Sequence, residues 1–248
     1  SLVGARLEEI GNYPLSTSKK EPQQLHLFER DPDFKIAVEE AIEKEHMIAS
    51  KSSLSLEDIH EKKAWLDDIE ELLGRYKAIC NVHVGILLGN GIDENQYLAI
   101  VKKKDFALAR KINKSVEYFH WQLEFPFLLR TGGFSVVIGN PPWISFGLRG
   151  VGVLDELLES YLRSNFPNSA EYKLSLYAVF MEAAINLLQQ NGIHSFIVPD
   201  SFLLGQYFYK VRTYILNNTR IQQLVLFLED FWQGASIGRC VIYSLKKE

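Results

Sequence analysis

Apolar residues recur at two different spacings along this chain, and the change of spacing divides it into two parts. Between Asp33 and about Lys114, apolar positions such as Ile69, Leu72 and Leu73 keep helical spacing among many charged residues. After about residue 115, short aromatic and β-branched runs alternate with helical stretches. The pattern therefore predicts packed or paired helices in the first part and a sheet with helices in the second.

Serine and glycine residues mark the expected helix ends in the first part. A break at 50–55 separates two helices, and Ser55 followed by Asp58 resembles a capping box, in which a hydroxyl and a carboxylate satisfy helix-end amides. A further break falls at 89–91, which reads Gly-Asn-Gly. Residues 1–30 contain glycines, prolines and a Ser/Thr/Lys cluster, so we expect a loop or a poorly ordered connection there.

The second part carries the signals of a parallel crossover. Residues 134–138 and 195–198 are apolar runs suited to strands buried on both faces. Between them, residues 174–190 form one broad apolar helical face, and 191–192, Asn-Gly, is a good helix C-cap. Strand, helix and strand in this order predict a right-handed parallel connection, the unit of a doubly wound α/β sheet. A helix at 206–217 and strands at 221–227 and 237–245 are expected to follow.

Composition narrows the class of protein. The chain is 47% hydrophobic and 23% charged, which is typical of a folded protein. Its net charge of -4 argues against nucleic-acid binding by the chain's overall charge, but a local basic patch could still bind phosphates. Cys80 and Cys240 lie outside any CxxC pattern, so a reducing cytoplasmic setting fits best. We find neither a long apolar run nor a signal peptide, and expect no membrane segment. Because the chain starts at Ser1 without an initiator methionine, we expect a piece of a longer protein.

The most informative segment is 134–143, FSVVIGNPPW, in which a buried strand leads into a rigid loop. In open α/β sheets ligands bind at the carboxyl ends of strands. Pro141 and Pro142 have no backbone N–H, so the loop presents carbonyl acceptors without competing donors. Asn140 adds a side-chain acceptor and Trp143 a broad π face. Together these groups suit a planar ring with an exocyclic amino group.

The motifs after this loop follow one family's order over residues 118–245. The chain resembles the gamma-type adenine-N6 DNA methyltransferases of restriction–modification systems, of the kind that combines restriction and modification in one protein. In that family an NPPY/F/W segment precedes a helix with an L-Y-x-x-F core, a strand ending in F-I-V-P-x-S-F-L, and an aromatic residue before a last strand. The matching segments here are Asn140–Trp143, Leu176–Phe180, Gly192–Leu203 and Glu229–Ile242.

The resemblance implies both a fold and a site. The fold is the rear part of a Rossmann-like methyltransferase sheet, over 118–248, with a helical insertion over 31–117. A flipped adenine enters a pocket of Asn140, Pro141, Pro142 and Trp143, and its amino group attacks the methyl group of S-adenosylmethionine. Trp143 and Phe231 stack on the two faces of the adenine.

The resemblance also implies a cofactor wall and partners beyond the chain. Tyr177 and Phe180 are its cofactor-wall residues, and a role in the core is equally open for both. Duplex DNA is the expected partner, through a longer protein that can carry a nuclease and a DNA-recognition domain.

The front of the chain departs from the family pattern. The family's glycine-rich cofactor loop and acidic ribose ligand are not found in residues 1–117, so we expect the chain alone to be inactive and to bind S-adenosylmethionine weakly or not at all. Residues 147–152, with three glycines, are interpreted as a mobile loop that closes over substrate.

Other interpretations stay open beside this one. A protein-glutamine or RNA methyltransferase uses similar loops, and a non-catalytic interaction module would use the sheet only as scaffold. The basic stretch 102–114 favours a solvated helix face over a phosphate contact. His120 is interpreted as a surface or packing residue, and the histidine spacing predicts no metal site. Asp33 with Glu61 only loosely resembles a nuclease pattern, because Glu61 falls on an expected helix.

Overall fold

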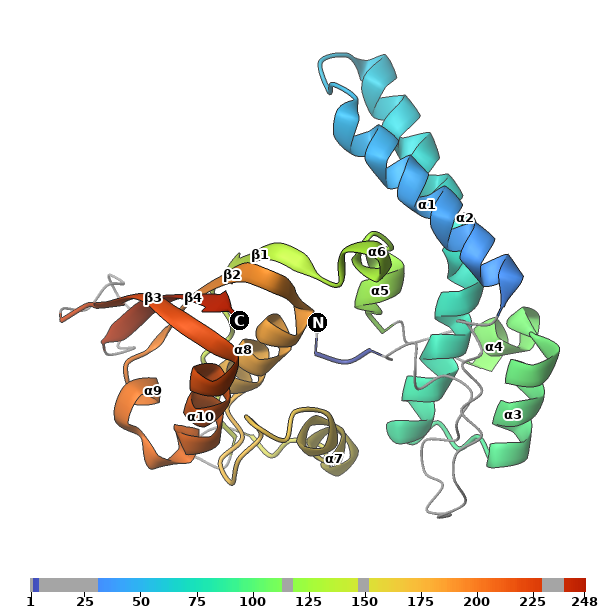
Figure 1. Cartoon of the computed structure of the whole chain (residues 1–248). Coiled ribbons are helices and arrows are strands. Elements are labelled where there is room, and N and C mark those ends of the chain that lie inside the picture. Colours follow the sequence, from blue (N-terminus) through green and yellow to red (C-terminus); the bar gives the residue numbers. More distant parts are fainter. Residues whose placement is uncertain (1, 5–30, 113–117, 147–151, 229–238) are drawn as a thin grey trace. The chain divides into compact units, whose positions relative to one another are not determined.

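The structure is a computed structural model that describes residues 2–4, 31–112, 118–146, 152–228 and 239–248 (Figure 1). The chain divides into two compact units, Val3–Arg130 and Thr131–Glu248. The division lies later than the boundary at residue 118 that the sequence suggested. The reason is that Leu123 is fully buried in the core of the first unit and Glu124 forms an ion pair with Lys77, at 3.0 Å, in the same unit.

The first unit is helical, as predicted. A capping box at Ser55 and Asp58 starts the second helix, since each side chain accepts from the other residue's backbone N–H. Asp31 and Asp93 cap two other helices by accepting from Asp33 N and Gln96 N. The helices are α1 (Pro32–Ser50), α2 (Leu56–Leu87), α3 (Glu94–Lys103), α4 (Phe106–Ile112), α5 (Trp121–Glu124) and α6 (Leu128–Thr131), of which the last reaches the start of the second unit.

Tyr76 lies at the centre of the first unit's core. Its ring meets Phe34 edge-on at 4.9 Å and Phe106 at 5.6 Å between centroids. Nearby, His83 Nδ1 forms a buried 2.9 Å hydrogen bond with the Tyr97 hydroxyl. Burial lowers the pKa of His83 to about 4, because no carboxylate in the described residues compensates an imidazolium there.

The second unit is an α/β layer around a four-stranded sheet in the order β1-β2-β4-β3 (Figure 1). Helices α8 and α10 supply Tyr177, Met181 and Ile215 to a core shared with the strands. The elements are β1 (Phe134–Gly139), α7 (Glu156–Asn165), α8 (Leu176–Leu187), β2 (Leu188–Pro199), α9 (Ser201–Leu204), the 3-10 helix η2 (Gln206–Phe208), α10 (Tyr209–Asn218), β3 (Thr219–Leu226) and β4 (Cys240–Lys247). The predicted α/β fold is confirmed.

The sheet is mixed, which corrects the expectation of a mostly parallel one. β1 and β2 pair in parallel, as the crossover predicted, whereas β4 pairs antiparallel with both β2 and β3. The last strand therefore inserts between two earlier strands instead of adding at an edge. Apolar patterning does not reveal this, because a strand with one covered face looks alike in either direction.

The helix before β2 ends earlier than the predicted cap at 191–192. α8 stops at Leu187, and the chain turns into β2 at Leu188, which is in register with Phe134. Asn191 has a left-handed φ of 66° inside the irregular start of the strand. The backbones of Gly133 and the helix end also approach closely here, since a Cβ on Gly133, whose φ is 145°, would lie 2.4 Å from Gln189 N.

His194 is fully buried in the middle of β2. Its ring lies 4.3 Å from Phe196 and 5.2 Å from Tyr243, and its Nε2 is 3.4 Å from the Tyr243 hydroxyl. Burial lowers the pKa of His194 to about 3. On the opposite face of the sheet, Val136 and Ile138 of β1 are 53% and 73% exposed. The prediction that residues 134–138 form a strand buried on both faces is therefore wrong, because helices of the described part of this unit cover only one face of β1.

A buried carboxylate fixes the loop between α7 and α8. Glu182, only 2% exposed, accepts hydrogen bonds from Asn168 Nδ2 at 2.7 Å and Ser169 Oγ at 2.6 Å. A carboxylate taken out of water needs such partners, so this segment has little conformational freedom.

Candidate active site

The Asn-Pro-Pro-Trp loop follows β1 directly, at the carboxyl end of the parallel strand pair. Asn140 and Pro142 are exposed, Pro141 is buried and Trp143 is half-buried. Gly139 lies against the ring of Phe196, where an added Cβ would come to 3.3 Å. The loop thus presents the Asn140 amide at the surface while its second residue anchors it.

Hydrogen bonds hold the loop at its Trp143 end and in the segment that follows. The Trp143 indole Nε1 donates to the backbone carbonyl of Ile197 in β2, at 3.3 Å. Beyond the loop, the Leu176 N–H donates to the Ile144 carbonyl and the Phe146 N–H donates to the Leu174 carbonyl, both at 2.8 Å. A short antiparallel bridge therefore ties the segment after Trp143 to the start of α8. Such fixation lets the acceptors keep their direction without a ligand.

Tyr177 connects α8 to the carboxyl end of the neighbouring strand β2. Its hydroxyl lies 3.4 Å from Ser201 Oγ, with either group able to donate, and its ring lies 5.2 Å from Phe208. Tyr177 is 3% exposed, and burial raises the pKa of its phenol. Phe180, half-buried, packs against the same core. Both residues have a place in the core, and the polar end of Tyr177 points to the edge that carries the loop.

Two residues at the end of β2 were missed by the sequence reasoning. Asp200 forms an ion pair with Arg239, in which Oδ2 and Nε are 3.8 Å apart. Ser201 starts α9 beside Tyr177. The sequence did contain a signal for them. In a parallel pair the residues after both strands lie at the same edge, and Asp200 and Ser201 follow β2 as Asn140–Trp143 follow β1. Asp200 is half-exposed, so a ligand at this edge can reach its carboxylate.

Several predicted features lie elsewhere or outside the described residues. Phe231 and residues 147–151 of the glycine loop fall outside the described residues. His120 is a packing residue rather than a surface one: it is 1% exposed and its Nε2 lies 2.7 Å from Asn81 Oδ1. In the basic stretch, Lys104 pairs with Asp31 at 2.8 Å.

The nuclease-like residues lie on helices and have cationic partners. Asp33 lies on α1 and pairs with Lys104 at 3.3 Å, and Glu61 lies on α2 and pairs with Lys51 at 2.6 Å. Within the described ranges, no cluster of three His, Cys, Asp or Glu residues could hold a metal ion.

The chemistry of the described site is that of hydrogen-bond acceptance beside an aromatic face. Two prolines remove donors from the loop, and the exposed Asn140 offers one amide oxygen. The indole of Trp143 is oriented by its bond to Ile197. Such an arrangement fits an amino group on a planar ring, which donates two hydrogen bonds and stacks.

Comparison with known proteins assigns the class: a methylase of restriction–modification systems. Residues 40–232 match the model of the Eco57I restriction-modification methylase family, and the chain belongs to that family. A type II restriction enzyme and methyltransferase of Methanocaldococcus jannaschii is 23% identical over 185 residues, which are 75% of this chain and 14% of that protein. The type II methyltransferase M.BstVI of Geobacillus stearothermophilus is 29% identical over 92 residues, which are 37% of this chain and 15% of that protein.

A structural comparison gives a weaker likeness. A class I S-adenosylmethionine-dependent methyltransferase from Listeria monocytogenes aligns over 97% of this chain and 85% of its own, with a TM-score of 0.37 and 14% identity. The matched part of the chain spans about one seventh of the length of each of the two curated relatives named in the previous paragraph. No helix within the described ranges is both long and apolar enough to cross a membrane.

Proposed function

We propose that this chain is the substrate-side part of an adenine-N6 DNA methyltransferase. The observation that carries the proposal is the Asn-Pro-Pro-Trp loop, which follows β1 at the carboxyl edge of a parallel strand pair and is held by hydrogen bonds at its Trp143 end, in a chain of a restriction-modification methylase family. The whole protein methylates duplex DNA in a restriction–modification or phage-defence system. It acts in the cytoplasm, and a nuclease and a DNA-recognition domain belong to the same protein or its partners.

The loop residues bind and orient a flipped adenine. A base inside a duplex hides its amino group, so it must leave the stack before reaction. Asn140 Oδ1 and the Pro141 carbonyl accept hydrogen bonds from the adenine amino group, which directs its nitrogen lone pair away from the loop. Trp143 stacks on one face of the ring and Phe231 on the other. A stacked aromatic contributes about 1–3 kcal/mol per base.

S-adenosylmethionine is the cofactor and supplies the methyl group. The residues present fit one side of it: Tyr177, with its hydroxyl at the end of β2, and Phe180 form a wall beside the loop. In the described residues β1 lies at the edge of the sheet. The proposal is that tight cofactor binding needs a longer form of the protein, because the sequence carries no glycine-rich cofactor loop ahead of Asn140.

The test compares the chain with a longer form of the protein. We expect calorimetric titration to show S-adenosylmethionine binding by the longer form and weak or no binding by residues 1–248. The longer form transfers a tritiated methyl group to adenine in DNA. Tight binding by the chain alone would refute the division of the cofactor site, and transfer to RNA or protein in place of DNA would favour the alternative methyltransferases.

Two substitutions in the longer form separate catalysis from scaffolding. Trp143→Ala removes the stacking face and is expected to lower methyl transfer at least about 5-fold. Trp65→Ala is the matched control, because it removes a half-buried indole from α2 in the first unit. Equal activity of both variants would favour a non-catalytic module.

A further inference from the structure

Tyrosines and lysines of the second unit lie in the loop before α8 and in the segment formed by η2 and the start of α10. Tyr172, 83% exposed, lies with its ring 6.3 Å from that of Tyr207, and the Lys173 ammonium sits 4.6 Å from the centre of the Tyr207 ring. Lys210 is exposed at the start of α10. We name Tyr172, Lys173, Tyr207 and Lys210 the tyrosine platform.

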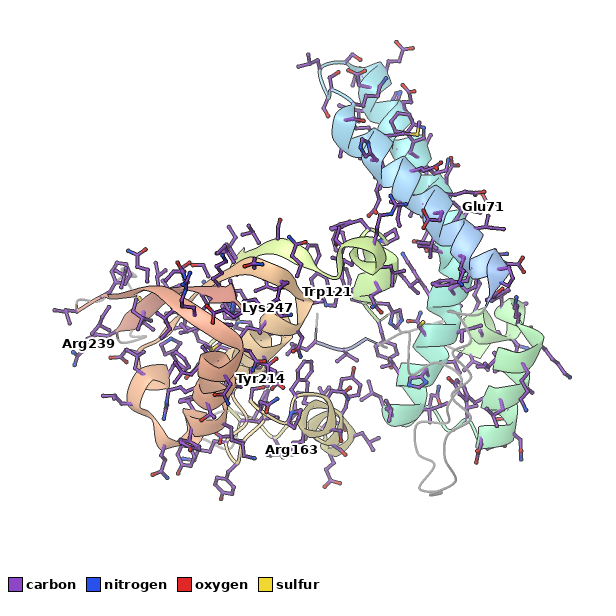
Figure 2. All side chains as sticks on the ribbon, in the orientation of Figure 1. Glu71, Trp121, Arg163, Tyr214, Arg239 and Lys247 are labelled. Carbon is purple, nitrogen blue, oxygen red and sulfur yellow. The ribbon has the colours of Figure 1, made fainter. Side chains whose placement is uncertain are left out.

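Hydrogen bonds from an arginine to backbone carbonyls fix the platform's first loop. Arg163 of α7, the residue labelled in Figure 2, donates through Nη1 to the carbonyls of Ala170 and Glu171, at 2.8 and 2.9 Å. The same guanidinium pairs with Glu159 at 2.7 Å, so its charge is balanced on the helix. Because Arg163 donates its hydrogen bonds to these backbone carbonyls, it fixes the loop that presents Tyr172.

The second loop is fixed in the same way and joined to the first. Arg212 Nη1 donates to the carbonyls of Phe202 and Gly205, at 2.8 and 2.7 Å. The Lys210 N–H donates to Glu171 Oε1 at 3.2 Å, which ties α10 to the first loop. The backbone that carries the exposed Tyr172 and the half-buried Tyr207 is thus held in place. A rigid exposed ring loses little entropy when a planar group stacks on it.

The tyrosine platform lies at the same edge of the sheet as the Asn-Pro-Pro-Trp loop. Lys173 immediately precedes Leu174, whose carbonyl accepts from the Phe146 N–H just beyond that loop. Tyr207 follows α9, which starts at the end of β2. Helices α8 and α10 both run back along strands that are parallel to each other, so both begin at this edge.

We propose that the tyrosine platform binds the nucleic-acid strand that carries the target base, with the rings packed against bases or sugars and the two lysines against phosphates. The charges near the rings support an anionic ligand: Lys173 and Lys210 carry positive charge, while the Glu159 carboxylate is paired with Arg163 and the Glu171 carboxylate accepts from the Lys210 N–H. Aromatic rings with cations between them form the usual surface for single strands, because every base has a π face. The inference rests on the proposed function, since it names the surface beside that site which holds the substrate.

The test measures strand binding by residues 1–248 directly. A fluorescein-labelled dT oligonucleotide, which lacks adenine and cannot be methylated at N6, is titrated and followed by anisotropy. Tyr172→Ala is expected to weaken binding at least about 5-fold, and Tyr172→Phe to retain it. Lys173→Ala is expected to lower the slope of log affinity against log salt by about 0.7, as for one phosphate contact on a single strand.

Controls make the outcome decisive. Lys102→Ala removes an exposed lysine from α3 in the first unit and should leave the affinity unchanged. An oligonucleotide containing 5-iodouracil should photocrosslink to Tyr172 or Tyr207 when mapped by mass spectrometry. Binding that is absent, or unchanged in Tyr172→Ala, overturns the platform. A longer form that transfers no methyl group overturns the proposed function but leaves this binding result standing.

Discussion

Acid should destabilise the second unit through His194. The imidazole has a pKa of about 3 in the folded chain because it is buried, against about 6.5 in the unfolded chain. Since the folded pKa is the lower one, the unfolded state binds the extra proton. The contribution of His194 is therefore complete above pH 6.5 and is lost progressively as the pH falls toward 3.

The size of the effect follows from the same two values. At pH 5.0 the pH lies about 1.5 units below the unfolded pKa, while the folded histidine is still neutral. Lowering the pH from 7.5 to 5.0 therefore costs about 2 kcal/mol of unfolding free energy. His83 and His120, with pKa values of about 4 and about 3, should together cost the first unit about 4 kcal/mol over the same range.

The assay separates the two units. Urea unfolding is followed by hydrogen exchange and mass spectrometry on peptides from β2 and from α2, at pH 7.5 and 5.0. In His194→Gln, the acid loss measured on β2 should shrink by about 2 kcal/mol while that on α2 stays as in the unmodified chain. His46→Gln, at an exposed position of α1, is the control. An unchanged acid loss on β2 in His194→Gln would refute the reasoning.

Three further predictions test the packing of the two units. Gly133→Ala should destabilise the second unit by more than about 3 kcal/mol in urea unfolding, because its Cβ meets backbone, whereas Gly132→Ala, with φ of 73° and open space, should cost about 1 kcal/mol. Glu182→Ala should cost about 3 kcal/mol by calorimetry and Glu182→Gln less, since its amide oxygen still accepts. Leu73→Ala, at a fully buried position, should lower the stability of the first unit alone by about 2–5 kcal/mol; equal losses in both units would contradict two separate cores.

Much of the candidate site could be predicted from sequence because its signals are local. Two prolines fix their own φ angles wherever the chain goes, and the apolar run before them predicts a strand, although not how much of that strand is buried. The anchoring of Trp143 was not predictable in this way. Its partner, the Ile197 carbonyl, belongs to another strand, so the bond depends on the register between β1 and β2.

The sequence by itself determined the helical first part, the capping box at Ser55 and the strand leading into Asn140, since each depends on residues only a few positions apart. Only the tertiary structure decided that β4 lies antiparallel between β2 and β3, and that α8 ends at Leu187. It also brought Ser201 to the Tyr177 hydroxyl and Tyr172 to Tyr207. These features arise where distant backbones meet, and the energy of such a meeting belongs to the pair of segments rather than to either one.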